Sequence, residues 1–116
     1  MLNQIVLVGR LVRNPELSNF SKGKYSKITL AVPRSFKNMN GEYETDFIDC
    51  TLWQGVAEST VNYCKKGDIV GVRGRLQSST YEKDGERKYV TEVIAEKVTF
   101  LTNKKPEDIE ETDELE

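Results

Sequence analysis

The chain has 116 residues, enough for one small domain with one modest hydrophobic core. Its formal net charge of −2 is unevenly spread, because residues 1–103 hold 15 basic and 12 acidic side chains whereas residues 104–116 hold seven acids. No apolar run is long enough to cross a membrane and the N-terminus lacks the pattern of a signal peptide, so we expect a cytoplasmic protein.

The first predicted elements are a strand and a turn. Residues 4–13 are rich in β-branched and aliphatic side chains, so we expect the first strand there. Gly9 interrupts this strand, which is typical of a bulge or of a bend in a small barrel. Residues 14–16, with a proline between two polar side chains, predict a turn, and the polar residues 18–24 predict a loop.

Two further strands follow, joined by a hairpin. Residues 25–33 are expected to form the second strand, which Pro33 should end or place at a sheet edge. The Asn-Gly pair at residues 40–41 favours a tight hairpin turn. Residues 45–53 form the third predicted strand, whose pattern is the most informative in the chain.

Alternation gives this third strand two different faces. One face is small and apolar, as a core face should be, and carries Ile48, Cys50 and Leu52. The other face mixes aromatic and polar side chains and carries Phe47, Asp49, Thr51 and Trp53. A core face rarely carries an aspartate, and a solvent face rarely carries two large rings. Either another element covers these rings, or they are platforms on which the bases of single-stranded nucleic acid stack.

The second half of the chain predicts one helix and two long strands. Residues 55–66 have helical spacing, and the lysines at their end together with Gly67 suit a helix C-terminus. Residues 69–76 predict a strand that leads into a hairpin arm over residues 78–89. Residues 90–101 predict the last strand.

The order of these elements indicates the fold class. Five strands, with one short helix between the third and the fourth, are typical of an all-β OB-fold, a Greek-key barrel. The apolar pattern stops after residue 103. We therefore expect an OB-fold domain over residues 1–103 and a short, acidic, disordered tail over residues 104–116.

The sequence offers little for catalysis. It contains no histidine, which removes the commonest general base and a common metal ligand. Asp46 and Asp49 fall on opposite faces of their strand, and Cys50 and Cys64 lack the spacing of a zinc site. We therefore expect no enzyme activity, no metal and no cofactor.

Aromatic and basic side chains form a more coherent set. Singly, each ring could be a packing partner and each cation a solvated charge. Together they favour a surface for a polyanion with flat bases, because rings stack on bases and cations meet phosphates. The expected contact residues are Phe36, Phe47, Trp53, Tyr81, Arg10, Arg34, Lys37, Arg73 and Arg75.

Recognisable segments occur in unbroken order along the chain. They include Val8-Gly9-Arg10-Leu11, Asn14-Pro15-Glu16-Leu17, Asp46-Phe47-Ile48, Lys65-Lys66-Gly67, Gly74-Arg75-Leu76 and Thr91-Glu92-Val93. Together they resemble the bacterial single-stranded DNA-binding protein family, in a form encoded by a bacterium or a phage. The resemblance runs from Met1 to about Leu101. It implies an OB-fold homotetramer around which DNA wraps, with stacking rings at Phe36, Phe47, Trp53 and Tyr81.

These observations predict sequence-independent binding and protection of single-stranded DNA during replication, recombination and repair, at the nucleoid. The alternative is an OB-fold replication-restart adaptor whose aromatic face binds protein, and a metal-dependent nuclease on the same barrel is a third hypothesis. The chain ends in Asp113-Glu114-Leu115-Glu116, whereas the family recruits replication and repair proteins through an acidic tip that ends in Pro-Phe. The tail is also a candidate competitor with DNA for the basic face.

Overall fold

The computed structural model describes residues 1–21 and 23–102, and within them it contains six strands and one helix. In chain order these are β1 (Ile5–Leu11), β2 (Ser18–Phe20), β3 (Gly23–Lys37), β4 (Tyr43–Trp53), α1 (Gln54–Tyr63), β5 (Ile69–Lys83) and β6 (Glu86–Phe100). The predicted tail, residues 104–116, lies outside the described residues, as does the predicted boundary at residue 103.

The strands close into a barrel. Their order in the sheet is β1-β5-β6-β4-β3-β2. An additional pairing between β1 and β3 closes the sheet into the barrel. All of the pairings are antiparallel except that between β4 and β6. The five barrel strands are β1, β3, β4, β5 and β6, and α1 connects the third of them to the fourth. The predicted OB-fold is confirmed.

The core lies inside the barrel and follows the alternation of the strands. The largest fully buried apolar side chains are Leu11, Ile28, Leu30, Leu52, Val70 and Val72. Ala57 from α1 is fully buried in this cluster. Cys50 is buried in the same cluster, and desolvation raises the pKa of its thiol to about 11. The thiol is therefore protonated near neutral pH and serves as a small core side chain.

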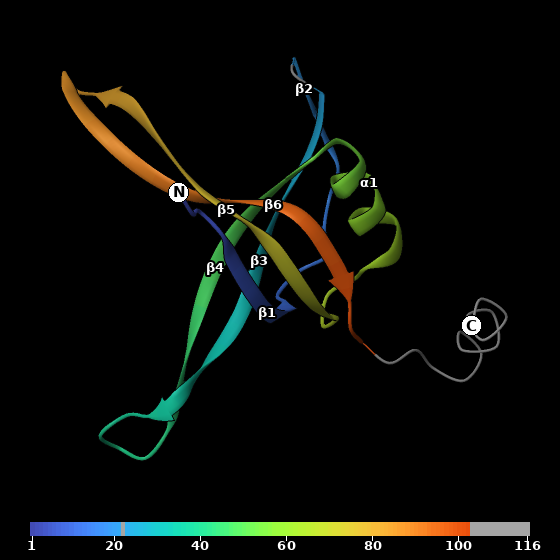
Figure 1. The fold of residues 1–116 in the computed structure, drawn as a ribbon, viewed down its shortest axis with the longest axis vertical. Helices are drawn as coiled ribbons and strands as arrows, with labels where there is room; N and C mark the ends of the chain where they lie inside the picture. The colour runs from blue at the N-terminus through green and yellow to red at the C-terminus, as the bar shows by residue number, and fades with distance from the viewer. Residues whose placement is uncertain (22, 103–116) are drawn as a thin grey trace, which may run out of the picture.

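Two arms project from the barrel (Figure 1). The β3–β4 arm, residues 34–44, is the outer end of the hairpin between β3 and β4. The β5–β6 arm, residues 77–92, begins beyond a register shift between Arg73 and Gly74. Gly74 is required there, because a Cβ atom at this position would collide with the backbone carbonyl of Ile94. The arm turns at Asp84 and Gly85, which both have positive φ values, as is typical of a tight hairpin turn.

Two predicted boundaries on the N-terminal side are wrong. Residues 18–24 are not a loop throughout, because β2 pairs with the start of β3, with Ser18 opposite Tyr25. Pro33 does not end its strand either. Instead β3 continues to Lys37, and the other predicted alternative holds. Among the described residues Pro33 pairs with Thr45 of β4 only, since β1 pairs with β3 no further than Ala31, so Pro33 lies where β3 has an open edge.

The predicted helix end is also wrong. The helix α1 ends at Tyr63, and Cys64 is already extended, because its side chain turns into the core. Gly67 has a positive φ value, but it lies in the turn that follows rather than at the helix cap. Among the described residues, no helix is long and apolar enough to span a membrane.

Candidate nucleic-acid interface

The outer face of β3 and β4 carries the candidate site. The two strands pair in register, so side chains opposite one another lie on the same face. From one end to the other, the outward pairs are Tyr25–Trp53, Lys27–Thr51, Thr29–Asp49 and Ala31–Phe47. The predicted separation of the two β4 faces is confirmed, because Cys50 and Leu52 point into the core.

Two adjoining depressions run along this face. One, of about 250 Å³, lies beside Trp53, and the other, of about 400 Å³, lies beside Phe47. Lys27, Thr51 and Glu92 line both of them. The depressions therefore form one groove, here called the β4 groove, with a ring at each end.

Phe47 is largely exposed to solvent. The residue is 67% exposed, which is unusual for a phenylalanine inside a strand. Trp53 lies six positions further along β4 on the same face, which corresponds to about 20 Å of strand. The β4 groove is thus long enough for several nucleotides of an extended single strand.

Trp53 lies in an aromatic cluster. Its ring centroid is 5.4 Å from that of Tyr25 and 6.5 Å from that of Phe20. These distances are typical of stabilising ring pairs, so Trp53 is held in place while it still lines the β4 groove. The sequence did not reveal Phe20 and Tyr25 as site residues, since Phe20 fell in a predicted loop and only the pairing of β2 with β3 brings it here.

The floor of the β4 groove is polar. The hydroxyl of Thr29 donates a hydrogen bond to Oδ1 of Asp49 at 2.5 Å, and that of Thr51 donates to Oε2 of Glu92 at 3.0 Å. Lys27 lies between the two ends of the β4 groove and forms no ion pair with the described residues. The local sequence around Lys27 does not mark it as a site residue.

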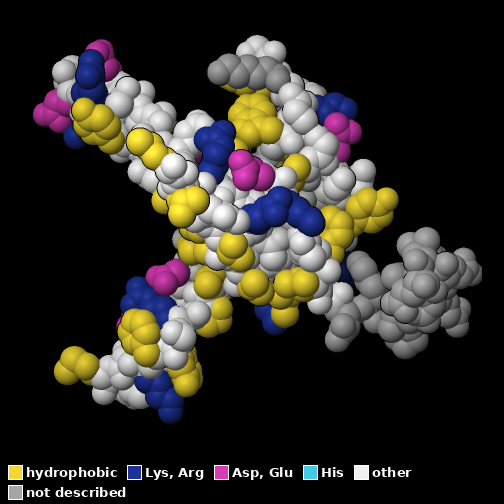
Figure 2. Space-filling view, viewed as in Figure 1, with side chains coloured by type: hydrophobic (Ala, Val, Ile, Leu, Met, Phe, Trp, Pro, Cys, Tyr) yellow, Lys and Arg dark blue, Asp and Glu magenta, His cyan; other side chains and the backbone are white. Residues whose placement is uncertain are grey.

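The two arms carry the other predicted rings. Tyr81 pairs with Lys88 on the β5–β6 arm, and two positions nearer the barrel Ser79 pairs with Val90, which lines the β4 groove. Tyr81 therefore shares the face of the β4 groove. Phe36 is exposed on the β3–β4 arm. Figure 2 shows hydrophobic, basic and acidic side chains on both arms.

The predicted basic residues are scattered. Arg34 forms hydrogen bonds and an ion pair with Asp46, with nitrogen–oxygen distances down to 3.0 Å. The hydrogen bond with Asp46 raises the pKa of Arg34, and the same bond lowers the pKa of Asp46. Lys37 lies 5.7 Å from the ring centroid of Tyr43, on the arm that carries Phe36. Arg34 thus stays charged but is already paired within the chain, whereas Lys37 forms no ion pair with the described residues.

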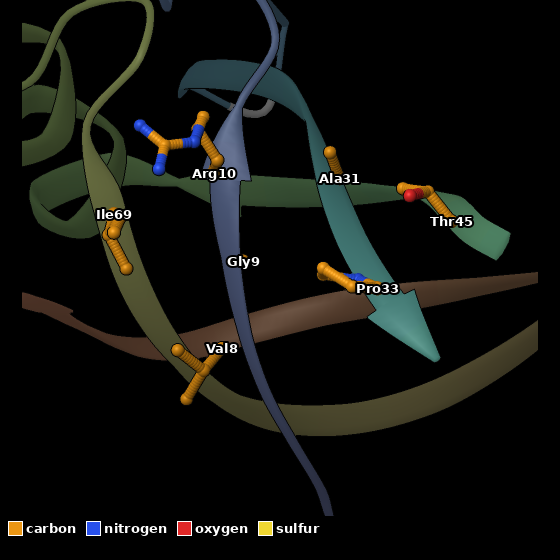
Figure 3. A pocket seen from close by; sticks show the side chains of 7 residues that line it. All are labelled: Val8, Gly9, Arg10, Ala31, Pro33, Thr45 and Ile69. Atoms are coloured by element: carbon orange, nitrogen blue, oxygen red, sulfur yellow. The ribbon is translucent and has the colours of Figure 1, made fainter. Parts of the chain in front are cut away.

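The remaining three arginines surround the barrel. Arg10 donates a hydrogen bond to the carbonyl oxygen of Gly67 at 2.8 Å. It lines a depression beside Val8 and Ile69 (Figure 3) and is not among the residues that line the β4 groove. Arg73 lies on β5, opposite Lys97 of β6 in the strand register. The strand β6 separates β5 from β4, which carries the groove. Arg75, beside the start of the β5–β6 arm, has its Nε 3.6 Å from Oε2 of Glu96. It also donates a hydrogen bond to Oε1 of Gln77. The structure therefore brings together the predicted rings better than the predicted cations.

An OB-fold barrel with exposed rings along one groove defines a binding protein for single-stranded nucleic acid. Residues 2–101 match the model of the single-strand binding protein family. The chain belongs to that family.

Curated relatives share about half of the residues. The chain is 51% identical over 106 residues to single-stranded DNA-binding protein B of Bacillus subtilis, a match that covers 90% of this chain and 94% of the relative. It is 52% identical over 103 residues to the single-stranded DNA-binding protein of Bacillus cereus, covering 87% of this chain but 61% of that longer one. Both relatives are named for the binding of single-stranded DNA.

Solved structures show the same fold. The single-stranded DNA-binding protein of Plasmodium falciparum, solved in complex with single-stranded DNA, aligns with a TM-score of 0.73 at 25% identity, covering 87% of this chain and 96% of that one. The Thermus aquaticus protein aligns with a TM-score of 0.73 at 29% identity, covering 89% of this chain and 52% of that one. Among the described residues, no group of three or more histidine, cysteine or acidic side chains is placed to hold a metal.

Proposed function

We propose that the protein binds single-stranded DNA without sequence preference along the β4 groove, and protects it during replication, recombination and repair at the nucleoid. The observation that carries the proposal is the pair of rings, Phe47 and Trp53, at the two ends of one groove. Every base has a flat face, so stacking on fixed rings suits a strand of any sequence. The similarity to named DNA-binding relatives supports this function over an adaptor for proteins.

The path of the strand follows from the placement of the rings. Bases stack on Phe47 and Trp53, while the phosphates lie toward Lys27 and Lys37. Phe36 and Tyr81 extend the stacking surface onto the two arms. Arg34 and Arg10 contribute less than their charge suggests, because each already has a partner within the chain.

Replacing Lys27 by glutamine should reduce the salt dependence of binding. If Lys27 meets one phosphate, the slope of log K against log salt becomes shallower by about 0.7. Titrations with oligo-dT at several salt concentrations measure that slope. The matched control is Lys24→Gln. The Nζ of Lys24 lies 3.8 Å from Oε2 of Glu58 on α1, and Lys24 does not line the β4 groove. Equal slopes for the Lys27 variant and the unaltered protein would exclude this phosphate contact.

We infer that further copies of the chain cover the outer face of β1. Val6 and Val8 are 66% and 53% exposed there. A depression of about 410 Å³ lies beside Val8, between β1 and the neighbouring strands (Figure 3). In the described part of the chain, Ile5–Gly9 pairs with a strand on one side only. An apolar face next to an open strand edge is typical of an oligomer interface.

Light scattering should give a homotetramer, with four times the chain mass of 13.2 kDa, with or without oligo-dT. Val6→Asp, which places a charge on this face, should shift the mass toward that of a single chain. A single-chain mass for the unaltered protein would contradict the inferred assembly.

A further inference from the structure

The ring of Phe20 lies at the Trp53 end of the β4 groove. Phe20 belongs to β2, a strand of three residues that pairs only with β3 among the described strands. Edge strands in soluble proteins usually present polar or charged side chains. Phe20 is nevertheless 57% exposed, and it lines the 250 Å³ part of the groove. More than half of its surface is left unused by the fold, which is typical of a binding residue.

Phe20 completes a wall of three rings. Its centroid lies 6.2 Å from that of Tyr25, in an edge-to-face arrangement, and 6.5 Å from that of Trp53, with the two planes tilted by 58°. Tyr25 and Trp53 are half-buried, so Phe20 is the most exposed of the three relative to its size. A base that reaches Trp53 therefore finds a second, more open ring directly beside it.

The start of β3 is tied to the start of α1, which holds the rings together. Gln54 directly follows Trp53 and has a positive φ value, which turns the chain sharply from β4 into α1. The backbone N–H of Lys24 donates a hydrogen bond to Oε1 of Gln54 at 3.4 Å. Gly23 permits this close approach, since a Cβ atom there would collide with the Gln54 amide. The strand that pairs with Phe20 is thus fixed against the residue after Trp53, so the two rings are positioned before DNA binds.

The same depression has a polar lining that orients a strand. It consists of Lys27, Thr51 and Glu92, and the Thr51 hydroxyl donates a hydrogen bond to Oε2 of Glu92 at 3.0 Å. Lys27 forms no ion pair with the described residues. A phosphate is attracted to Lys27 and repelled by Glu92, whereas a base has a flat face that suits a ring. The backbone of a bound strand therefore lies on the Lys27 side and its bases lie toward the rings.

We propose that Phe20 is a further base-stacking residue, which extends the β4 groove beyond Trp53 onto β2. This inference rests on the proposed binding of single-stranded DNA in that groove and adds one contact to it. The nucleotide next to the one on Trp53 stacks on Phe20. The contact uses the face of the base, so it tolerates any sequence.

Photochemical cross-linking tests this contact in the unaltered, full-length protein. The probe is oligo-dT in which one thymine at a time is replaced by 5-iodouracil, which links on irradiation to an aromatic side chain in contact with it. Peptide mass spectrometry should locate a link at Phe20 for at least one position of the label. A residue that only supports Trp53 from behind would not be linked.

Three variants measure what the contact contributes to affinity. Phe20→Leu removes the ring but keeps an apolar side chain, Phe20→Tyr keeps the ring, and Tyr63→Leu removes an exposed ring on α1 outside the groove. The Kd for oligo-dT should rise about fivefold for Phe20→Leu, the low end for one base–aromatic stack, and stay within about twofold for the other two. The slope of log K against log salt should not change, because no phosphate contact is lost.

Two results would overturn the proposal. One is an unchanged Kd for Phe20→Leu. The other is the absence of a link at Phe20 while links form elsewhere in the groove, since any loss of affinity in Phe20→Leu would then come from a displaced Trp53. Failure of the unaltered protein to bind oligo-dT would instead contradict the proposed function itself, so the two failures are distinguishable.

Discussion

Replacing Phe47 by alanine should weaken binding of oligo-dT by about 1–3 kcal/mol, the contribution of one base–aromatic stack. That loss corresponds to a rise in Kd of roughly 5- to 150-fold. The reason is local: the exposed ring of Phe47 supports little of the fold, so its removal takes away a binding platform and leaves the barrel intact. Fluorescence or filter titrations at fixed salt measure the change.

The matched control for this substitution is Tyr63→Ala. Tyr63 is also an exposed ring, but it lies on α1 and contacts Phe100 rather than the β4 groove. The control should bind oligo-dT as the unaltered protein does. If Phe47→Ala keeps full affinity while its unfolding curve is unchanged, the DNA strand does not use this end of the groove.

Replacing Leu52 by alanine should lower the free energy of unfolding by about 2–5 kcal/mol, the range for a buried leucine truncated in a packed core. Leu52 is 0% exposed and lies between Thr51 and Trp53, on the inward face of β4. Its loss leaves a cavity behind the strand that carries the groove. Urea unfolding followed by circular dichroism measures the change through the midpoint of the transition.

The same chemical change at Leu2, which is 98% exposed, serves as the control. Leu2→Ala should leave the midpoint within the small range of ordinary surface substitutions. A Leu52→Ala protein as stable as the Leu2→Ala protein would contradict the assigned inward face of β4. It would also remove the basis for placing Phe47 and Trp53 together on the outer face.

The sequence predicted the fold and the character of β4 because both depend on local alternation. Period-two spacing alone separated Cys50 and Leu52 from Phe47 and Trp53, and the structure keeps this separation. The hairpin arm predicted over residues 78–89 was equally local, and it turns at Asp84 and Gly85. Pro33 left two alternatives open, a strand end or a sheet edge. The edge holds, because β1 stops pairing with β3 at Ala31, and that point depends on the partner strand.

The electrostatics of the site could not be predicted in the same way. Arg10 was expected to meet phosphates, yet its hydrogen-bond acceptor is the backbone of Gly67, 57 residues further along the chain. Lys27 could not be predicted as a contact residue, since nothing in its immediate sequence shows that it faces the middle of the groove. Such relations depend on strand register and barrel closure, which bring together distant parts of the chain.

Trp53 is the single tryptophan of the chain, so its fluorescence reports directly on the β4 groove. Titration with oligo-dT, with binding followed independently by filter retention, measures whether bases reach that ring. We predict a quench of Trp53 emission that saturates together with the filter signal, because a base stacks on the indole. Filter retention that saturates with no change in Trp53 emission would place the DNA elsewhere and contradict the assigned interface.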